Sequence, residues 1–208
     1  MEPTKQQKPR TRQAAGGRRR DRAATKQRLV DAVGSVLVRD GVLALGVNSI
    51  AKQANVDKVL IYRYFSNLDG LYRVYAEKVQ LWPDLADVAG DAPAVLHTLP
   101  PVDRLALMLG NFAEALARRP WNLDVVAWRT LETNALTDAL TAQQAKLDRQ
   151  MRDLTIVGSG LSAEIVELRL TTIVDAIAMD LVRHRQSDRP AAATAAPLQD
   201  LAGWIFSA

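Results

Sequence analysis

Two short helical patterns follow one another at residues 48–65, "NSIAKQANVDKVLIYRYF", with only a tight turn between them. The first pattern has apolar residues at helical spacing, namely Ile50, Ala51 and Ala54. "ANVD" predicts the turn, and Asn48 and Asp57 are expected to cap the first and the second helix. The stretch therefore predicts a compact pair of helices rather than one continuous helix.

The second helix of this pair has an inner and an outer face. Ile61 and Phe65 are four residues apart, which predicts that both point into the core. The outer side chains form one exposed stripe, Lys58, Val59, Tyr62 and Arg63, with Leu60 and Tyr64 at its margins. A helical pair with a merely solvated outer face is the alternative interpretation.

The chemistry of this stripe suits the groove of a nucleic acid. Arg63 can bind guanine through two hydrogen bonds, Lys58 can pair with phosphate or guanine, and tyrosine hydroxyls can bond to phosphate oxygens. Val59 or Leu60 can contact a thymine methyl group. We therefore predict that the stripe contacts double-stranded DNA.

Charge is distributed unevenly along the chain and agrees with this prediction. Residues 1–22 hold eight Lys and Arg against two acidic residues, a net charge of +6, and residues 23–80 add +3. Residues 81–208 carry a net charge of −5. Lys and Arg supply most non-specific affinity for DNA, so the front of the chain fits a nucleic-acid-binding segment. Residues 1–22 are predicted to be a disordered basic arm, which is either a solvated tail or a DNA contact.

Composition excludes several other classes of protein. The 208 residues are 48% hydrophobic and 24% charged, as in ordinary globular proteins, and no apolar run approaches the roughly 18 residues of a membrane span. The absence of cysteine excludes disulfides and thiolate metal sites. No apolar signal core follows the N-terminal charges, so we expect a cytoplasmic protein without membrane contact.

From Thr25 to about Val79 the chain resembles the DNA-binding domain of the tetracycline-repressor (TetR) family. In that family a first helix ending in Gly precedes a small polar residue, "IA", a short gap to "AGVS", a recognition helix ending in Tyr, two variable residues and Phe, and a Ser-capped fourth helix. Here the same places hold Gly41, Asn48, "IAKQANVD", "KVLIYRYF" and Ser66.

The resemblance implies roles for eight DNA-binding residues. Lys58, Val59, Leu60 and Arg63 would face base edges or the groove wall, Tyr62 and Tyr64 would hold phosphates, and Asn48 and Ser49 would offer another phosphate site. The chain departs from the family where members usually have a small residue and Thr instead of Val59 and Leu60. It also has Leu68 instead of the usual Lys, so fewer phosphate hydrogen bonds are available, and the basic arm is expected to compensate.

Helical patterns continue throughout residues 81–208, so we predict an all-α fold. One helix runs over "VDRLALMLGNFAEALA" to Pro120, another from Trp121 to about Ile156 with a break near Asn134, and a long one follows Ser162. A short C-terminal helix follows the linker "RPAAATAAP". The predicted domains are the arm 1–22, a helix-turn-helix domain 23–80, and an effector-binding and dimerisation domain 81–208.

The long helix after Ser162 is apolar on two sides, so both sides should be buried. The simplest arrangement buries one side in the core and the other, with the C-terminal helix, against a second copy; a monomer with a large core is the alternative. The predicted homodimer contacts are Leu170, Ile173, Ile177, Leu181, Leu201, Trp204 and Ile205. The resemblance implies the same assembly and, with a two-fold axis, a pseudo-palindromic operator.

The resemblance also implies a pocket for a small-molecule effector between the helices of the larger domain. The large side chains that could line it are Trp82, Met108, Phe112, Trp121 and Trp128, with His97 as a polar anchor. These residues are equally consistent with plain core. A ligand that favours one dimer geometry would change the separation of the recognition helices and release DNA, and repression is the role that the resemblance implies.

No catalytic arrangement is visible, since the two histidines lack metal-ligand spacing and "GSGLSAE" is a poor phosphate loop. We therefore predict no enzyme activity, no cofactor and no metal. A basic DNA-binding protein without sequence preference is the main alternative, and an unrecognised helical enzyme or a structural helical protein are further ones.

Overall fold

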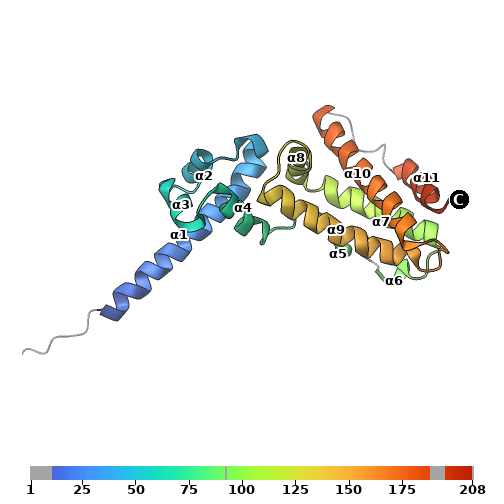
Figure 1. Cartoon of the computed structure of the whole chain (residues 1–208), viewed down its shortest axis with the longest axis horizontal. Coiled ribbons are helices and arrows are strands. Elements are labelled where there is room, and N and C mark those ends of the chain that lie inside the picture. Colours follow the sequence, from blue (N-terminus) through green and yellow to red (C-terminus); the bar gives the residue numbers. More distant parts are fainter. Residues whose placement is uncertain (1–10, 92, 188–194, 208) are drawn as a thin grey trace, which may run out of the picture. The chain divides into compact units, whose positions relative to one another are not determined.

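A computed structural model describes residues 11–91, 93–187 and 195–207, and it is all-α: none of these residues lies in a strand (Figure 1). The chain divides into two compact units, Met1–Tyr75 and Ala76–Ala208. The predicted domain boundaries at residues 22 and 80 stay predictions. Within the described ranges, no helix combines the length and the apolar character needed to cross a membrane.

The first unit contains four α-helices and a short 3₁₀ helix. These are α1 (Thr11–Asp40), η1 (Val42–Ala44), α2 (Val47–Gln53), α3 (Val59–Phe65) and α4 (Leu68–Ala76). Apolar side chains from all four α-helices form one core, which includes Leu29, Val33, Val36, Leu37, Ile50, Ile61, Phe65, Leu71 and Tyr75. Burial of this core fixes α2 against α1 and holds the inner face of α3.

Helix α1 is longer than the sequence analysis predicted. It begins at Thr11 instead of Thr25, so it contains residues 11–22 of the arm for which disorder was predicted. Residues 1–10 of that arm lie outside the described residues. The helix ends at Asp40, and Gly41 follows with φ of +78°, a conformation that glycine adopts without strain.

The second unit contains seven helices in the part of the chain that the structure describes. They are α5 (Leu85–Ala89), α6 (Pro93–Leu96), α7 (Pro101–Ala117), α8 (Pro120–Arg129), α9 (Ala135–Ile156), α10 (Ala163–Ser187) and α11 (Ala195–Phe206). Helix α7 packs against α5, α10 and α11, and α9 packs against α8 and α10. The linker before α11 lies, for residues 188–194, outside the described ranges.

Two helix N-termini in this unit lie where the sequence predicted them. The Asn134 side chain caps α9 by accepting hydrogen bonds from the backbone N–H groups of Leu136 (3.0 Å) and Thr137 (3.2 Å). The Ser162 hydroxyl accepts one from the backbone N–H of Ile165 (3.3 Å) at the start of α10. The predicted break near Asn134 and the predicted cap at Ser162 are therefore confirmed.

A partly buried polar network joins α8, α9 and α10. Arg129 donates to the Gln144 amide oxygen and to the Asp175 carboxylate (3.3 Å), and Gln144 donates to the same carboxylate (2.9 Å). Asp148 is 8% exposed, and Thr171 donates to its Oδ2 (3.4 Å). Burial, together with the nearby Asp175 carboxylate, raises the pKa of Asp148 to about 6. A carboxyl group with a raised pKa favours the folded state only while it is protonated.

Replacement of Asp148 by Asn should stabilise the protein at alkaline pH. The pKa of Asp148 is near 4 in the unfolded chain and about 6 in the folded protein. The Asp148 carboxyl group therefore adds to the free energy of unfolding below pH 4, and this contribution is lost as the pH rises through about 6. The new amide side chain would keep an oxygen for Thr171 and would carry no charge. We expect the free energy of unfolding, from urea denaturation, to rise by roughly 2 kcal/mol at pH 8 and to change little at pH 4. Asp153→Asn, an exposed position on the same helix, is the control and should lack this pH-dependent gain. If the free energy of unfolding had the same pH dependence in wild type and D148N, this explanation would be contradicted.

Candidate functional site

The turn between α2 and α3 sets the direction in which α3 leaves it. Asn55 adopts φ of +52°, a left-handed conformation that Asn tolerates better than most residues. The Asp57 carboxylate accepts a hydrogen bond from the Val59 backbone N–H (2.8 Å), so it satisfies the start of α3 as predicted. Ile61 and Phe65 are buried, as their spacing predicted. The inner face of α3 is thus fixed at both ends.

The outer face of α3 carries the stripe that the sequence predicted. Lys58 and Arg63 are exposed, and Val59 and Tyr62 keep 59% and 52% of their surface accessible. The marginal residues, Leu60 and Tyr64, are half-buried. Two cations, two phenol groups and two aliphatic side chains therefore share one surface. Their role in binding DNA stays a prediction.

The start of α2 differs from the prediction. Gly46, in place of Asn48, occupies the capping position, and the Ser49 hydroxyl accepts a hydrogen bond from the Gly46 backbone N–H (3.1 Å). The same hydroxyl donates to the carbonyl oxygen of Ala44 (2.6 Å), so its proton is engaged within the turn. Asn48 is exposed and accepts a hydrogen bond from Lys58 Nζ (3.4 Å). This contact brings the predicted phosphate site of α2 next to the start of α3.

Two cations of α1, which are not among the predicted DNA-binding residues, extend the positive surface. The Arg22 guanidinium lies 5.3 Å from the centre of the Tyr64 ring, and Lys26 Nζ lies 6.0 Å from the same ring and 5.6 Å from that of Phe65. The four-residue spacing of Arg22 and Lys26 places them on one face of α1, a signal that the sequence does contain. Tyr64 thus lies between α1 and the outer stripe.

The backbone of α4 approaches the end of α3 closely at Gly70. A Cβ atom at Gly70 would lie 2.0 Å from the carbonyl oxygen of Phe65, so only glycine fits. The Asn67 side chain accepts a hydrogen bond from the Gly70 backbone N–H (2.7 Å). Asn67 therefore caps α4, in place of the Ser66 that the family pattern suggested.

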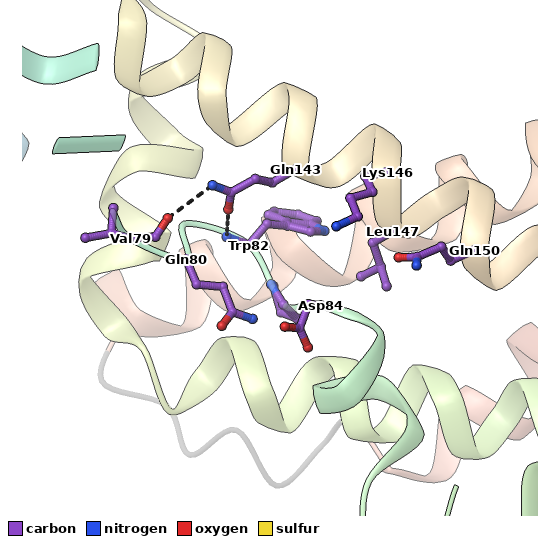
Figure 2. Close-up of a pocket in the computed structure, with 9 residues that line it drawn as sticks. Val79, Gln80, Trp82, Asp84, Gln143, Lys146, Leu147 and Gln150 are labelled. Carbon is purple, nitrogen blue, oxygen red and sulfur yellow. Dashed lines mark hydrogen bonds between the residues drawn. The ribbon is translucent and has the colours of Figure 1, made fainter. Parts of the chain in front are cut away.

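The second unit contains a cavity of about 310 Å³ beside the segment that follows α4 (Figure 2). Its lining comes from residues 79–84 and from one face of α9, and the residues are Val79, Gln80, Trp82, Pro83, Asp84, Gln143, Lys146, Leu147 and Gln150. The Gln143 side chain donates to the carbonyl oxygen of Val79 (3.2 Å) and accepts from the backbone N–H groups of Leu81 (2.7 Å) and Trp82 (3.1 Å). Gln143 thereby holds the segment against α9.

Of the six predicted ligand-binding residues, only Trp82 lines this cavity. Met108 and Phe112 are fully buried on α7, where the Phe112 ring packs 5.3 Å from that of Trp82. Trp121 and Trp128 are half-buried on α8, and His97 is exposed after α6. The residues of α9 that line the cavity were not predicted, although Gln143, Lys146, Leu147 and Gln150 recur at helical spacing.

The predicted dimer contacts on α10 lie on a buried face of that helix. The side chains of Leu170, Ile173, Ile177 and Leu181 are each less than 5% exposed, because this face of α10 packs inside its own unit. On α11, Ile205 is buried, Leu201 is half-buried and Trp204 is 47% exposed. The accessible apolar side chains of α10 lie on the other face, where Ile165 and Leu168 are 43% and 72% exposed.

Arg169 joins this outer face of α10 to α11. It donates to the backbone carbonyls of Ile205 (2.8 Å) and Ser207 (2.6 Å), and its guanidinium lies 5.5 Å from the centre of the Trp204 ring. Ile165, Leu168 and Trp204, which we call the outer apolar patch, are therefore carried by two helices fixed to each other. In the described part of the chain, no group of three or more acidic or histidine side chains could hold a metal ion.

Comparison with protein families gives one match. Residues 29–75, from the middle of α1 to the end of α4, match the family described as bacterial regulatory proteins, tetR family. This range contains the α2–α3 turn and the whole stripe. No curated protein matches the chain in sequence.

Solved structures share the fold over most of the chain. A transcriptional regulator from Rhodococcus sp. Rha1 (RHA1_ro04179) has a TM-score of 0.57 at 19% identity, covering 87% of this chain and 95% of its own. A TetR-like transcriptional regulator from Rhodococcus sp. RHA1 has a TM-score of 0.53 at 18% identity, covering 86% and 93%. HlyIIR, a hemolysin II transcriptional regulator, has a TM-score of 0.54 at 16% identity, covering 89% and 96%. At these identities the similarity establishes the fold.

Gly70→Ala should destabilise the first unit, because the added methyl group would meet the Phe65 carbonyl oxygen and force α4 away from α3. We expect a loss of roughly 2–4 kcal/mol in the free energy of unfolding, measured by urea denaturation with circular dichroism. Gly203→Ala, a helical site on α11 where a Cβ would meet nothing within 4 Å, is the matched control. An equal midpoint for G70A and wild type would show that this close approach is not needed.

Proposed function

We propose that this chain, whose residues 29–75 belong to the tetR family of bacterial regulatory proteins, is a ligand-responsive transcriptional repressor. It binds a pseudo-palindromic operator as a homodimer and leaves the operator when a small molecule binds. The observation that carries the proposal is the exposed stripe of α3, whose opposite face is buried by Ile61 and Phe65.

DNA recognition is assigned to α3 with support from α1 and α2. Arg63 reads guanine in the major groove, Lys58 and Tyr62 bind phosphates, and Val59 contacts a thymine methyl group. Arg22 and Lys26 add positive charge beside Tyr64, which compensates for the Lys that family members carry where this chain has Leu68. The side chains of α3 thus combine base contacts with backbone positioning.

The homodimer is formed through the outer apolar patch of α10 and α11. Ile165, Leu168 and Trp204 are large apolar side chains that a lone chain leaves in water. A two-fold axis through this patch would pair two copies of the same surface and present two α3 helices to successive turns of DNA, about 34 Å apart. The operator would then contain two inverted half-sites.

The effector binds in the cavity between residues 79–84 and α9. This segment begins at Val79, shortly after α4 ends at Ala76, so a change in its position acts on the end of α4. A ligand can shift the dimer only as far as its affinities for the DNA-bound and free geometries differ. Repression is the role that the family resemblance implies.

Arg63→Ala should weaken operator binding by about 10- to 100-fold, because each half-site would lose one bidentate base contact. The measurement is a gel shift on the DNA that flanks the gene, with excess bulk DNA as competitor. Tyr62→Ala should weaken the same complex, whereas Arg118→Ala, at an exposed cation just after α7, removes equal charge and should leave it intact.

Two results would speak against sequence-specific binding through α3. If bulk DNA erases the complex, the protein binds DNA without sequence preference, as basic architectural proteins do. If R63A and Y62A bind like wild type, the basic residues of α1 alone carry the affinity.

Leu168→Glu should convert the homodimer to a monomer, since a carboxylate would be placed in the middle of the outer apolar patch. Sedimentation equilibrium should show half the wild-type mass, and operator affinity should fall with it. Leu131→Glu, at a side chain that is 81% exposed after α8, is the control for added charge. A dimeric L168E protein would place the dimer interface elsewhere.

A further inference from the structure

The cavity wall contains a hydrogen-bond donor without an acceptor. Trp82 is 1% exposed, and its indole nitrogen Nε1 is buried with no hydrogen-bond partner within the described residues. A buried N–H group that lacks an acceptor destabilises the protein relative to a bonded one. A ligand that supplies an acceptor at this position recovers that loss.

A second donor faces the same place, and it is charged. Lys146 comes from α9, lines the cavity and is exposed, and Figure 2 shows its amine pointing toward the nitrogen-bearing edge of the Trp82 ring. An N–H group and an ammonium group can be satisfied together by one anionic acceptor, and such charge-assisted hydrogen bonds are the strong ones. The pair therefore selects an anion over a neutral acceptor.

The other charged group in the cavity wall is already engaged. The Asp84 carboxylate accepts hydrogen bonds from the backbone N–H groups of Ala86 (2.9 Å) and Asp87 (3.0 Å) at the start of α5. Its negative charge disfavours a multiply charged anion such as phosphate next to a single lysine. The balance of charge in the lining favours a ligand with one negative charge.

The rest of the wall is suited to an apolar body. Val79, Pro83 and Leu147 contribute aliphatic surface beside the Trp82 ring. A volume of about 310 Å³ is at the lower end of the range for ligand cavities, roughly 300–1,000 Å³. The cavity therefore fits a small molecule with an aromatic or short aliphatic body.

We infer that the effector is a small amphipathic monocarboxylate, whose carboxylate binds between Trp82 Nε1 and Lys146 Nζ. Calling this ligand the effector rests on the proposed function, but binding of the carboxylate to the cavity does not require DNA. The indole nitrogen is shielded from solvent, so side chains of the cavity wall must shift before the carboxylate reaches it.

The test compares acids with their neutral amides, using isothermal titration calorimetry on the full chain at pH 7.5 without DNA. The probes are benzoate, 4-phenylbutanoate and octanoate, each beside its primary amide. At least one acid should bind about tenfold more tightly than its amide, because only the acid forms charge-assisted bonds. Binding of no acid, or equal binding of acid and amide, overturns the inference.

Three variants locate the carboxylate. Lys146→Met should weaken binding of the acid by about tenfold and remove the preference for the acid over the amide. Trp82→Phe should also weaken binding of the acid, although an aromatic ring is kept at this position. Arg149→Met removes an exposed cation one turn further along α9 and should bind the acid like wild type. Lys146 is exposed, so K146M should fold, and its melting temperature checks this. Unchanged acid binding in K146M contradicts the assignment.

Gel shifts with the same acids separate this inference from the proposed function. Acids that bind at Lys146 but leave the operator complex intact would support the ligand class and contradict ligand-induced release. An operator complex that forms normally, in a protein that binds none of the acids, would contradict the ligand class alone.

Discussion

The orientation of α3 depends on the burial of Ile61 and Phe65 in the core of the first unit. Each such side chain stabilises the fold by roughly 1.5–3 kcal/mol when it leaves water. Rotation of the helix by one residue would expose part of this face and turn Arg63 toward an apolar core, which is unfavourable for an unpaired cation. The side chains of the outer stripe can therefore vary, while the direction in which this face of α3 points stays fixed. That separation lets a small helical pair present charged and aromatic side chains outward without relying on them for stability.

The first unit could be predicted largely from the sequence because its signals are local. The spacing of Ile61 and Phe65, the Asp57 cap and the Gly41 stop each act within a few residues. The cap of α2 could not be predicted in this way, since Asn48 is a good capping residue by its type. Gly46 takes the position because the Ser49 hydroxyl bridges the Gly46 N–H and the Ala44 carbonyl, a contact with the preceding 3₁₀ helix.

For the second unit, the positions of the helices could be predicted from the sequence, but which face of each helix is buried could not. Helix α10 is apolar on two sides, and hydrophobic spacing alone does not say which side meets the core. The face with Leu170 and Ile177 packs within the unit, and the face with Leu168 stays accessible. The cavity was missed for a similar reason: large aromatic residues were expected to line it, yet Met108 and Phe112 fill the core. The polar residues of α9 line it because Gln143 holds the loop after α4 across that face.

This contact of Gln143 also limits how a ligand could act on α4. Three hydrogen bonds, at about 0.5–1.5 kcal/mol each, hold the backbone of Val79, Leu81 and Trp82 to α9. Typical coupling free energies between two sites are about 1–3 kcal/mol, so a ligand beside Trp82 would not break all three bonds. The segment from Val79 to Trp82 should then move with α9 as one piece. Residues 77 and 78 form a turn between the last residue of α4 and this held segment. We therefore expect a ligand-driven change in backbone angles to concentrate at these two residues.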